Sequence, residues 1–177
     1  MFAAVSRLPF RAWPWVLLTL IATSLLLTAL YFQFVMGLKP CMMCVYQRVA
    51  VVGVILSGFC GIWGHPYVLT RWLAYAGWIV SSGWGLKVAH DQVLEEQLVA
   101  GGGFSTCPIF PDFPEWMPLH DWLPALFKPT GICGDVAWTL FGYSMPFWMR
   151  VVFGLLLLSA LVVVASQLKQ HKYNPYD

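Results

Sequence analysis

The sequence predicts an all-α membrane protein, a four-transmembrane-helix bundle with one long loop outside the membrane. Three observations lead to this prediction. The 177 residues are 59% apolar and only 10% charged, with a mean hydropathy of +0.70. Four stretches are each close to the roughly 20 apolar residues that a helix needs to cross a bilayer. The prolines and glycines are densest between residues 101 and 146, outside those stretches.

The four predicted spans cover about residues 15–34, 43–63, 67–86 and 147–166. The first contains no charged residue, whereas each of the others carries one arginine: Arg48, Arg71 and Arg150. The alternative for the first span is a cleaved signal peptide, because Arg7 and Arg11 precede it. Its length, the lack of an obvious cleavage site and the three spans that follow argue against that alternative.

We expect a single membrane domain over residues 1–177, with both termini on one side. The short 35–44 loop and the long 87–146 loop then share the other side. The Lys/Arg count is nearly tied and only weakly favours cytoplasmic termini. Tryptophans near the span ends, such as Trp15 and Trp63, are expected at the membrane interface. The net charge of +2 and the scattered basic residues give no indication of nucleic-acid binding.

Cys41 and Cys44 form a C-x-x-C motif that follows Pro40 and opens the second span. Helix N-termini favour a thiolate, so both sulfurs lie where redox chemistry is favoured. Arg48 lies four residues beyond Cys44 on the same helix face, and a charge at membrane depth marks function by default. Haem attachment would need histidine at position 45, which is Val45. A zinc site would need two further ligands, which Cys107 and Cys133 could supply.

Cys107 and Cys133 lie in the long loop, on the same side as Cys41 and Cys44. Disulfides persist in oxidising compartments, so a bridge between Cys107 and Cys133 would face the periplasm. From the residues alone, a purely structural bridge is at least as good an interpretation as a redox pair. Cys60 lies deep in the second span, where a small packing residue is favoured over a buried redox relay.

Two segments carry a resemblance to a known family. The run from Tyr31 to Arg48, YFQFVMGLKPCMMCVYQR, resembles the first loop of the DsbB family of inner-membrane disulfide-generating proteins. The run from Phe113 to Trp122, FPEWMPLHDW, resembles the loop between that family's second pair of cysteines. The hydrophobic layout is similar over nearly the whole chain.

The resemblance implies a membrane thiol:quinone oxidoreductase that reoxidises a periplasmic DsbA-like partner, with disulfides Cys41–Cys44 and Cys107–Cys133. The partner's thiolate would attack Cys107, Cys133 would then attack Cys41, and Cys44 would react with the quinone. It also implies a multi-pass protein of the bacterial inner membrane, with cytoplasmic termini and periplasmic redox cysteines.

The resemblance further implies ubiquinone or menaquinone as cofactor, with Arg48 and His90 at the quinone site and no metal. For His90, an ordinary interfacial histidine is nearly as good an interpretation. The sequence departs from the family at Gln47, where relatives carry Glu, and at the flexible lead Gly101–Gly103 before Cys107.

The run from Glu115 to Phe127 is expected to form short helical pieces, because Pro118 and Pro124 interrupt it. These pieces either lie on the bilayer surface or pack on the bundle. Two other functions remain open at this point. One reverses the electron flow, reducing partner disulfides or a quinone epoxide. The other is a non-enzymatic assembly or metal-delivery scaffold with structural cysteines.

Overall fold

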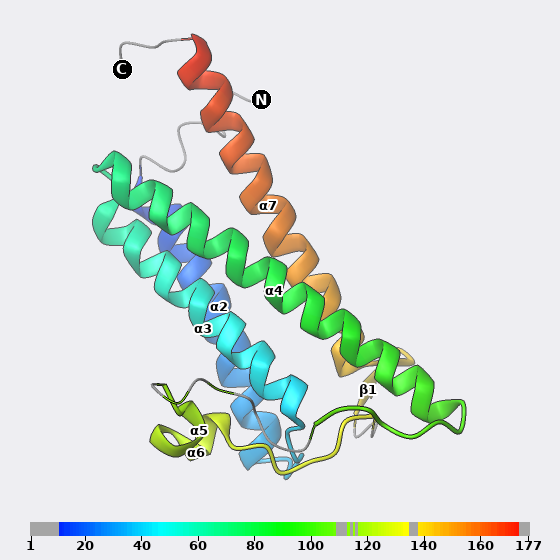
Figure 1. Ribbon diagram of the computed structural model, residues 1–177. Helices are drawn as coiled ribbons and strands as arrows, with labels where there is room; N and C mark the ends of the chain where they lie inside the picture. Colours follow the sequence, from blue (N-terminus) through cyan, green and yellow to red (C-terminus); the bar gives the residue numbers. More distant parts are fainter. Residues whose placement is uncertain (1–10, 109–112, 114, 116, 135–137, 174–177) are drawn as a thin grey trace.

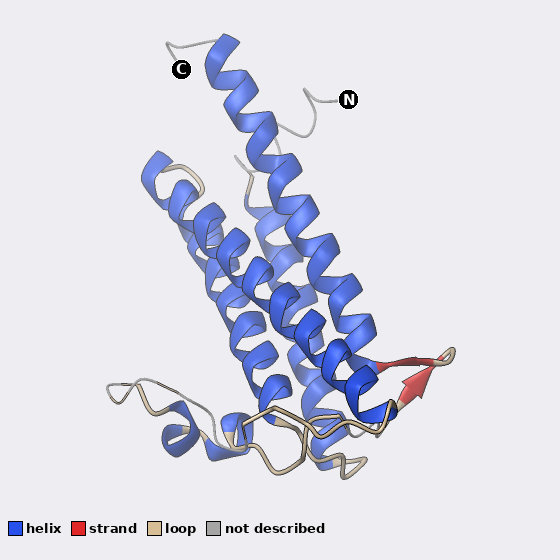
Figure 2. Ribbon diagram, turned by 45° about the vertical axis from the view of Figure 1, so that its right-hand side comes forward, coloured by secondary structure: helices blue, strands red, loops and turns tan. Residues whose placement is uncertain are grey.

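Four long helices lie side by side along most of their length (Figures 1 and 2). The computed structural model describes residues 11–108, 113, 115, 117–134 and 138–173. The long helices are α2 (Ala12–Phe34), α3 (Met42–Gly64), α4 (Val68–Ala100) and α7 (Met145–Tyr173). Arg7, named above for the signal-peptide alternative, and Pro114 and Trp116 of the family motif lie outside the described residues.

Three of the described helices are long and apolar enough to cross a membrane, namely α2, α3 and α7. α4 carries more charge, yet it packs against both α3 and α7 and completes the bundle. The four-helix membrane fold predicted above is therefore confirmed. The start of α2, the α3–α4 turn and the end of α7 gather at one end, and the loops that hold the four paired cysteines lie at the other (Figure 1).

α4 differs from the predicted third span, because it continues 14 residues beyond position 86. Its 33 residues extend about 50 Å, well beyond a hydrocarbon core of roughly 30 Å. Residues 87–100 lack proline and glycine and are rich in Leu, Glu and Gln, which favour helix. The helix ends where Gly101–Gly103 begins, so the predicted 87–146 loop starts only at residue 101.

The remaining loop contains short elements. α5 (Leu119–Trp122) and α6 (Pro124–Phe127) are the helical pieces expected around the two prolines. Phe127 is buried whereas Trp122 is exposed, so this region packs on the bundle through one side. β1 (Thr139–Leu140) and β2 (Tyr143–Ser144) form a small antiparallel hairpin with Leu140 opposite Tyr143, an element that the sequence did not predict.

The core of the bundle is built where small residues let large ones approach. The Trp15 ring packs directly on Gly61 of α3, where any side chain would overlap it. The Phe153 ring packs on Gly85 of α4 in the same way. Trp15, in the first turn of α2, is therefore buried and contacts Tyr75, so its ring packs inside the bundle; its position at the depth of the membrane interface stays a prediction. Trp63, in contrast, is 82% exposed at the end of α3, as expected for an interfacial tryptophan.

Candidate functional site

The C-x-x-C motif forms the first turn of α3. Cys41 is the N-cap residue, and its sulfur accepts a hydrogen bond from the backbone N–H of Cys44 at 3.4 Å. The two sulfurs are 3.0 Å apart, as separate thiols. The predicted position of both cysteines at a helix N-terminus is therefore confirmed, and the unpaired N–H groups there favour a negatively charged sulfur.

The second pair, Cys107 and Cys133, is joined in a disulfide. Cys133 is buried and packs in one cluster with Cys41 and Met42, while Cys107 lies at the edge of that cluster. The loop is held there by the carbonyl of Pro40, which accepts hydrogen bonds from the N–H groups of Thr130 at 2.9 Å and Gly131 at 3.0 Å. The fold thus brings together two cysteine pairs that are separated by more than 60 residues in the sequence.

Gly131 is required by this close approach. A side chain at position 131 would meet the backbone carbonyl of Lys39, so only glycine lets the loop reach Pro40. The segment that carries Cys133 therefore rests directly on the segment that carries Cys41.

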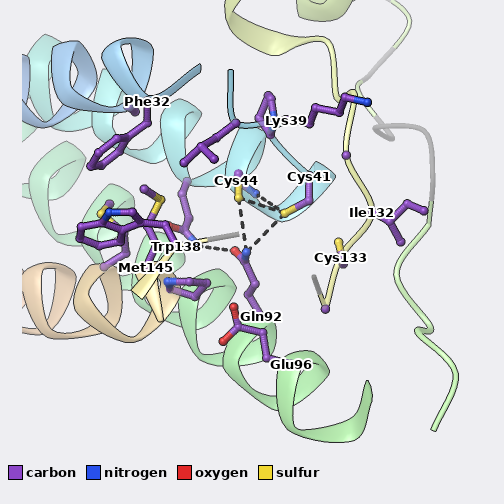
Figure 3. A pocket seen from close by; sticks show the side chains of 18 of the residues that line it. Phe32, Lys39, Cys41, Cys44, Gln92, Glu96, Ile132, Cys133, Trp138 and Met145 are labelled. Carbon is purple, nitrogen blue, oxygen red and sulfur yellow. Dashed lines mark hydrogen bonds between the residues drawn. The ribbon is translucent and has the colours of Figure 1, made fainter. Parts of the chain in front are cut away.

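Two buried glutamines complete the first cysteine pair. The amide Nε2 of Gln92, on α4, lies 3.3 Å from the sulfur of Cys41 and 3.3 Å from that of Cys44 (Figure 3). Its Oε1 accepts a hydrogen bond from Nε2 of Gln47 at 2.8 Å. Both glutamines are 5% exposed, so water does not compete for these bonds.

Arg48 reaches from α3 toward α2 and the loop. Its Nη1 donates to Gln33 Oε1 at 2.6 Å and to the Leu126 carbonyl at 2.9 Å, and its Nη2 lies 3.5 Å from the Ala29 carbonyl. Its charge also interacts with the sulfurs of Cys41 and Cys44. Guanidinium has five N–H donors, so donors remain beyond those used by the described residues.

Cys44 and Arg48 line one cavity of about 870 Å³, a size typical of cofactor sites. Apolar side chains from several helices form much of its wall, including Leu25, Val51 and Met149. A ring with carbonyl oxygens needs an apolar enclosure and a hydrogen-bond donor, and this cavity has both. The residues present therefore fit a quinone head group.

The two thiols of the first pair are not equivalent. The hydrogen bond shared with the Cys44 sulfur, together with burial, raises the pKa of Cys41. Cys41 therefore keeps its proton, and the negative charge of a singly deprotonated pair falls on Cys44, beside Arg48.

Two residues that the sequence analysis singled out, His90 and Cys60, lie outside this cavity. His90 is exposed on α4 and is not among the residues that line the cavity, so its role in quinone binding stays a prediction. Cys60 is exposed and lies 16 residues beyond Cys44, about 24 Å along α3. Its predicted packing role is therefore wrong; Gly58 and Gly61 form the close contacts there.

For the zinc alternative, the described residues contain no group of three or more His, Cys, Asp or Glu arranged to hold a metal ion. The bond between Cys107 and Cys133 also removes two of the thiolate ligands that this alternative required.

Sequence reasoning missed Gln92 and Gln33, and saw Gln47 only as a departure from the family. A polar residue at or near membrane depth is itself a signal, and it would have identified Gln33. Gln92 lay beyond the predicted end of the third span, so nothing in the sequence placed it near the cysteines.

Fold and site together define a class: a helical membrane protein whose cysteine pairs meet beside a cavity suited to a redox cofactor. The family model for disulfide bond formation protein DsbB matches residues 11–163, and the chain belongs to the DsbB family.

Curated relatives support this assignment over nearly the whole chain. The disulfide bond formation protein B of Shewanella loihica is 45% identical over 170 residues, which cover 96% of this chain and 98% of the relative. That of Idiomarina loihiensis is 44% identical over 162 residues, covering 91% and 89%. That of Psychromonas ingrahamii is 45% identical over 163 residues, covering 92% and 87%.

Proposed function

We propose that the four paired cysteines form one electron path, from Cys107–Cys133 to Cys41–Cys44 and then to a quinone beside Arg48. As a member of its family, this multi-pass inner-membrane protein is a thiol oxidoreductase. It reoxidises a DsbA-type dithiol oxidase and passes the electrons to ubiquinone or menaquinone, which sustains disulfide bond formation. The observation that carries the residue assignment is the packing of Cys133 against Cys41 at the cavity.

The first exchange takes place at the loop disulfide. A thiolate of the partner attacks Cys107, which is the half-buried member of the pair, whereas Cys133 is buried. A bond forms between the partner sulfur and Cys107, the Cys107–Cys133 bond breaks, and its electron pair leaves on Cys133 as a thiolate.

The second exchange moves the electrons to the membrane pair. The Cys133 thiolate attacks Cys41 of an oxidised Cys41–Cys44 pair, and the electrons of the broken bond leave on Cys44. The partner's second thiol releases Cys107, whose thiolate then attacks Cys133 and frees Cys41. The products are an oxidised partner, an intact Cys107–Cys133 bridge and a reduced Cys41–Cys44 pair.

The described residues hold that reduced pair ready to be oxidised. Cys41 retains its proton, the Cys44 thiolate lies on the cavity wall, and Arg48 has donors left for a carbonyl oxygen. A quinone supplies a two-electron acceptor when it is bound. Apolar side chains such as Val51 and Met149 form part of the same wall, and low-dielectric surroundings strengthen the attraction between a thiolate and a neighbouring guanidinium.

The test mixes the purified protein in detergent micelles with a soluble ubiquinone analogue and a reduced thioredoxin-like dithiol, and follows quinone absorbance. We expect turnover by the wild type and none by Cys44→Ser, with the Cys107–Cys133 bridge still present by mass spectrometry. Cys60→Ser is the matched control, because this cysteine is exposed and remote, and it should turn over normally. Absence of quinone reduction by the wild type would overturn the proposed function.

A further inference from the structure

We propose that Gln92 is a catalytic residue, an amide donor that stabilises the sulfurs of the reduced Cys41–Cys44 pair, and that Gln47 positions it. This proposal deepens the function above and rests on it. The contacts that carry it come from two different helices, α3 and α4, which meet at the cavity (Figure 3).

The orientation of the Gln92 amide follows from its partners. In the 2.8 Å bond to Gln47, the Gln92 oxygen is the acceptor, so its NH₂ group faces the cysteines. An amide NH₂ has two N–H donors, and here two sulfur acceptors lie at the same distance of 3.3 Å. Donors and acceptors therefore match in number in this orientation.

A donor in this position acts on the redox equilibrium. A disulfide sulfur is a weak acceptor, whereas a thiolate accepts strong, charge-assisted hydrogen bonds. Gln92 therefore stabilises the reduced pair more than the oxidised pair. When the Cys41–Cys44 bond breaks and its electrons leave on Cys44, the amide N–H groups are already in place to receive that charge.

Burial makes the effect large and specific. Gln92 and Gln47 are each 5% exposed, and an unpaired amide there would lose its hydrogen bonds to water without replacement. The Gln47 bond fixes the amide rotation, so Gln47 acts on the sulfurs through Gln92 and touches neither of them in the described contacts. Gln47 is thus a positioning residue.

The test measures the redox equilibrium of the pair in the full-length protein, without quinone or protein partner. Wild type and variants are equilibrated in glutathione buffers and alkylated, and the fraction of Cys41–Cys44 disulfide is read by peptide mass spectrometry. For Gln92→Met we expect the equilibrium constant for reduction to fall about tenfold, about 30 mV toward a more reducing potential. Gln97→Met, an exposed glutamine of the same helix, is the matched control and should equal wild type.

A double-mutant cycle separates positioning from direct action. Gln47→Met should shift the equilibrium in the same direction by a smaller factor, and should add no further shift in the Gln92→Met background. A Gln92→Met equilibrium within twofold of wild type would overturn the proposal, as would a Gln47→Met effect that persists without Gln92. If Gln92→Met does not fold, an unchanged Gln47→Met equilibrium overturns it.

Failure of this proposal is distinguishable from failure of the proposed function. If the wild type reduces no quinone, the proposed function is wrong. The glutathione equilibrium of the Cys41–Cys44 pair still tests the role of Gln92 in that case.

Discussion

Arg48 shows how one buried charge serves both binding and structure. It is 6% exposed, and its bonds to Gln33 and to the Leu126 carbonyl join α2, α3 and the α6 region around the cavity. Such a charge is stable at this depth only because oxygen acceptors surround it. The same acceptors fix the orientation of the guanidinium on the cavity wall, so its remaining N–H donors are held in place for a ligand.

Arg48→Lys should therefore weaken quinone binding while leaving both disulfides able to form. Lysine keeps the charge but loses the planar fork that satisfies two acceptors at once. Loss of one charge-assisted bond to the quinone corresponds to a roughly tenfold higher apparent KM for the quinone analogue. Steady-state kinetics with varied quinone measure this. Arg71→Lys is the control, because Arg71 lies in the first turn of α4, at the end of the bundle away from the cysteines. Equal KM values for the wild type, Arg48→Lys and Arg71→Lys would contradict the role given to Arg48.

At the scale of elements, the extension of α4 beyond the predicted span organises both cysteine pairs. Its first added turns carry Gln92 to the Cys41–Cys44 pair. One turn further on, the carboxylate of Glu95 accepts hydrogen bonds from the Thr106 N–H at 3.1 Å, the Thr106 hydroxyl and the Ser105 hydroxyl at 3.3 Å. These bonds hold the segment that leads into Cys107.

The contact with Glu95 predicts that the docking of the segment before Cys107 depends on pH. Hydrogen bonds from Thr106 above all, and from Ser105, lower the pKa of Glu95 below its ordinary value of 4.5. A depressed pKa means that the contact stabilises the docked segment above the ordinary pKa, and that this stabilisation is lost as the pH falls through the folded-state value. We expect hydrogen-exchange protection of residues 104–107, corrected for intrinsic rates, to fall on acidification from pH 6 to below 4.

Glu95→Gln provides the comparison. The neutral amide cannot titrate, so protection in this variant should be lower at pH 6 and should change little with pH. Glu115→Gln, which alters an exposed carboxylate elsewhere in the loop, should behave as wild type. A wild-type protection pattern that does not respond to pH would show that Glu95 does not hold the segment.

The elements also show what a sequence can and cannot predict. Hydropathy located all four long helices, and the cysteine motif located the start of α3, because both signals are local. The end of α4 was placed too early because membrane thickness limits a span but does not limit a helix. The burial of Trp15 was not predicted because the glycine that its ring packs against, Gly61, lies 46 residues away. The contacts of Gln92 and the docking on Pro40 depend on helix packing, which no local pattern encodes.

At the scale of the whole molecule, the arrangement of the helices predicts orientation. The α3–α4 turn and the loop that carries α5 and α6 lie at opposite ends of the bundle (Figure 1). If the paired cysteines face the periplasm, Lys128 must face it too, and Tyr67 must face the cytoplasm. Both side chains are exposed, so each position can carry a reporter.

We expect a membrane-impermeant maleimide to label Lys128→Cys in intact spheroplasts, and Tyr67→Cys only after the membrane is permeabilised. Both variants are made in a Cys60→Ser background, and that parent serves as the baseline for labelling. The reverse pattern would place the redox cysteines in the cytoplasm and would be incompatible with the proposed function.

The burial of the cysteines along the path has a consequence for selectivity between reductants. Cys107 is half-buried, whereas Cys133 and Cys41 are each 5% exposed beneath the loop that rests on Pro40. A small thiol arriving from the aqueous side meets Cys107 and finds the next two sulfurs shielded. Exchange between a small thiol and the Cys41–Cys44 pair is therefore slow and passes through Cys107, so rapid electron transfer to the pair requires a partner that docks at Cys107.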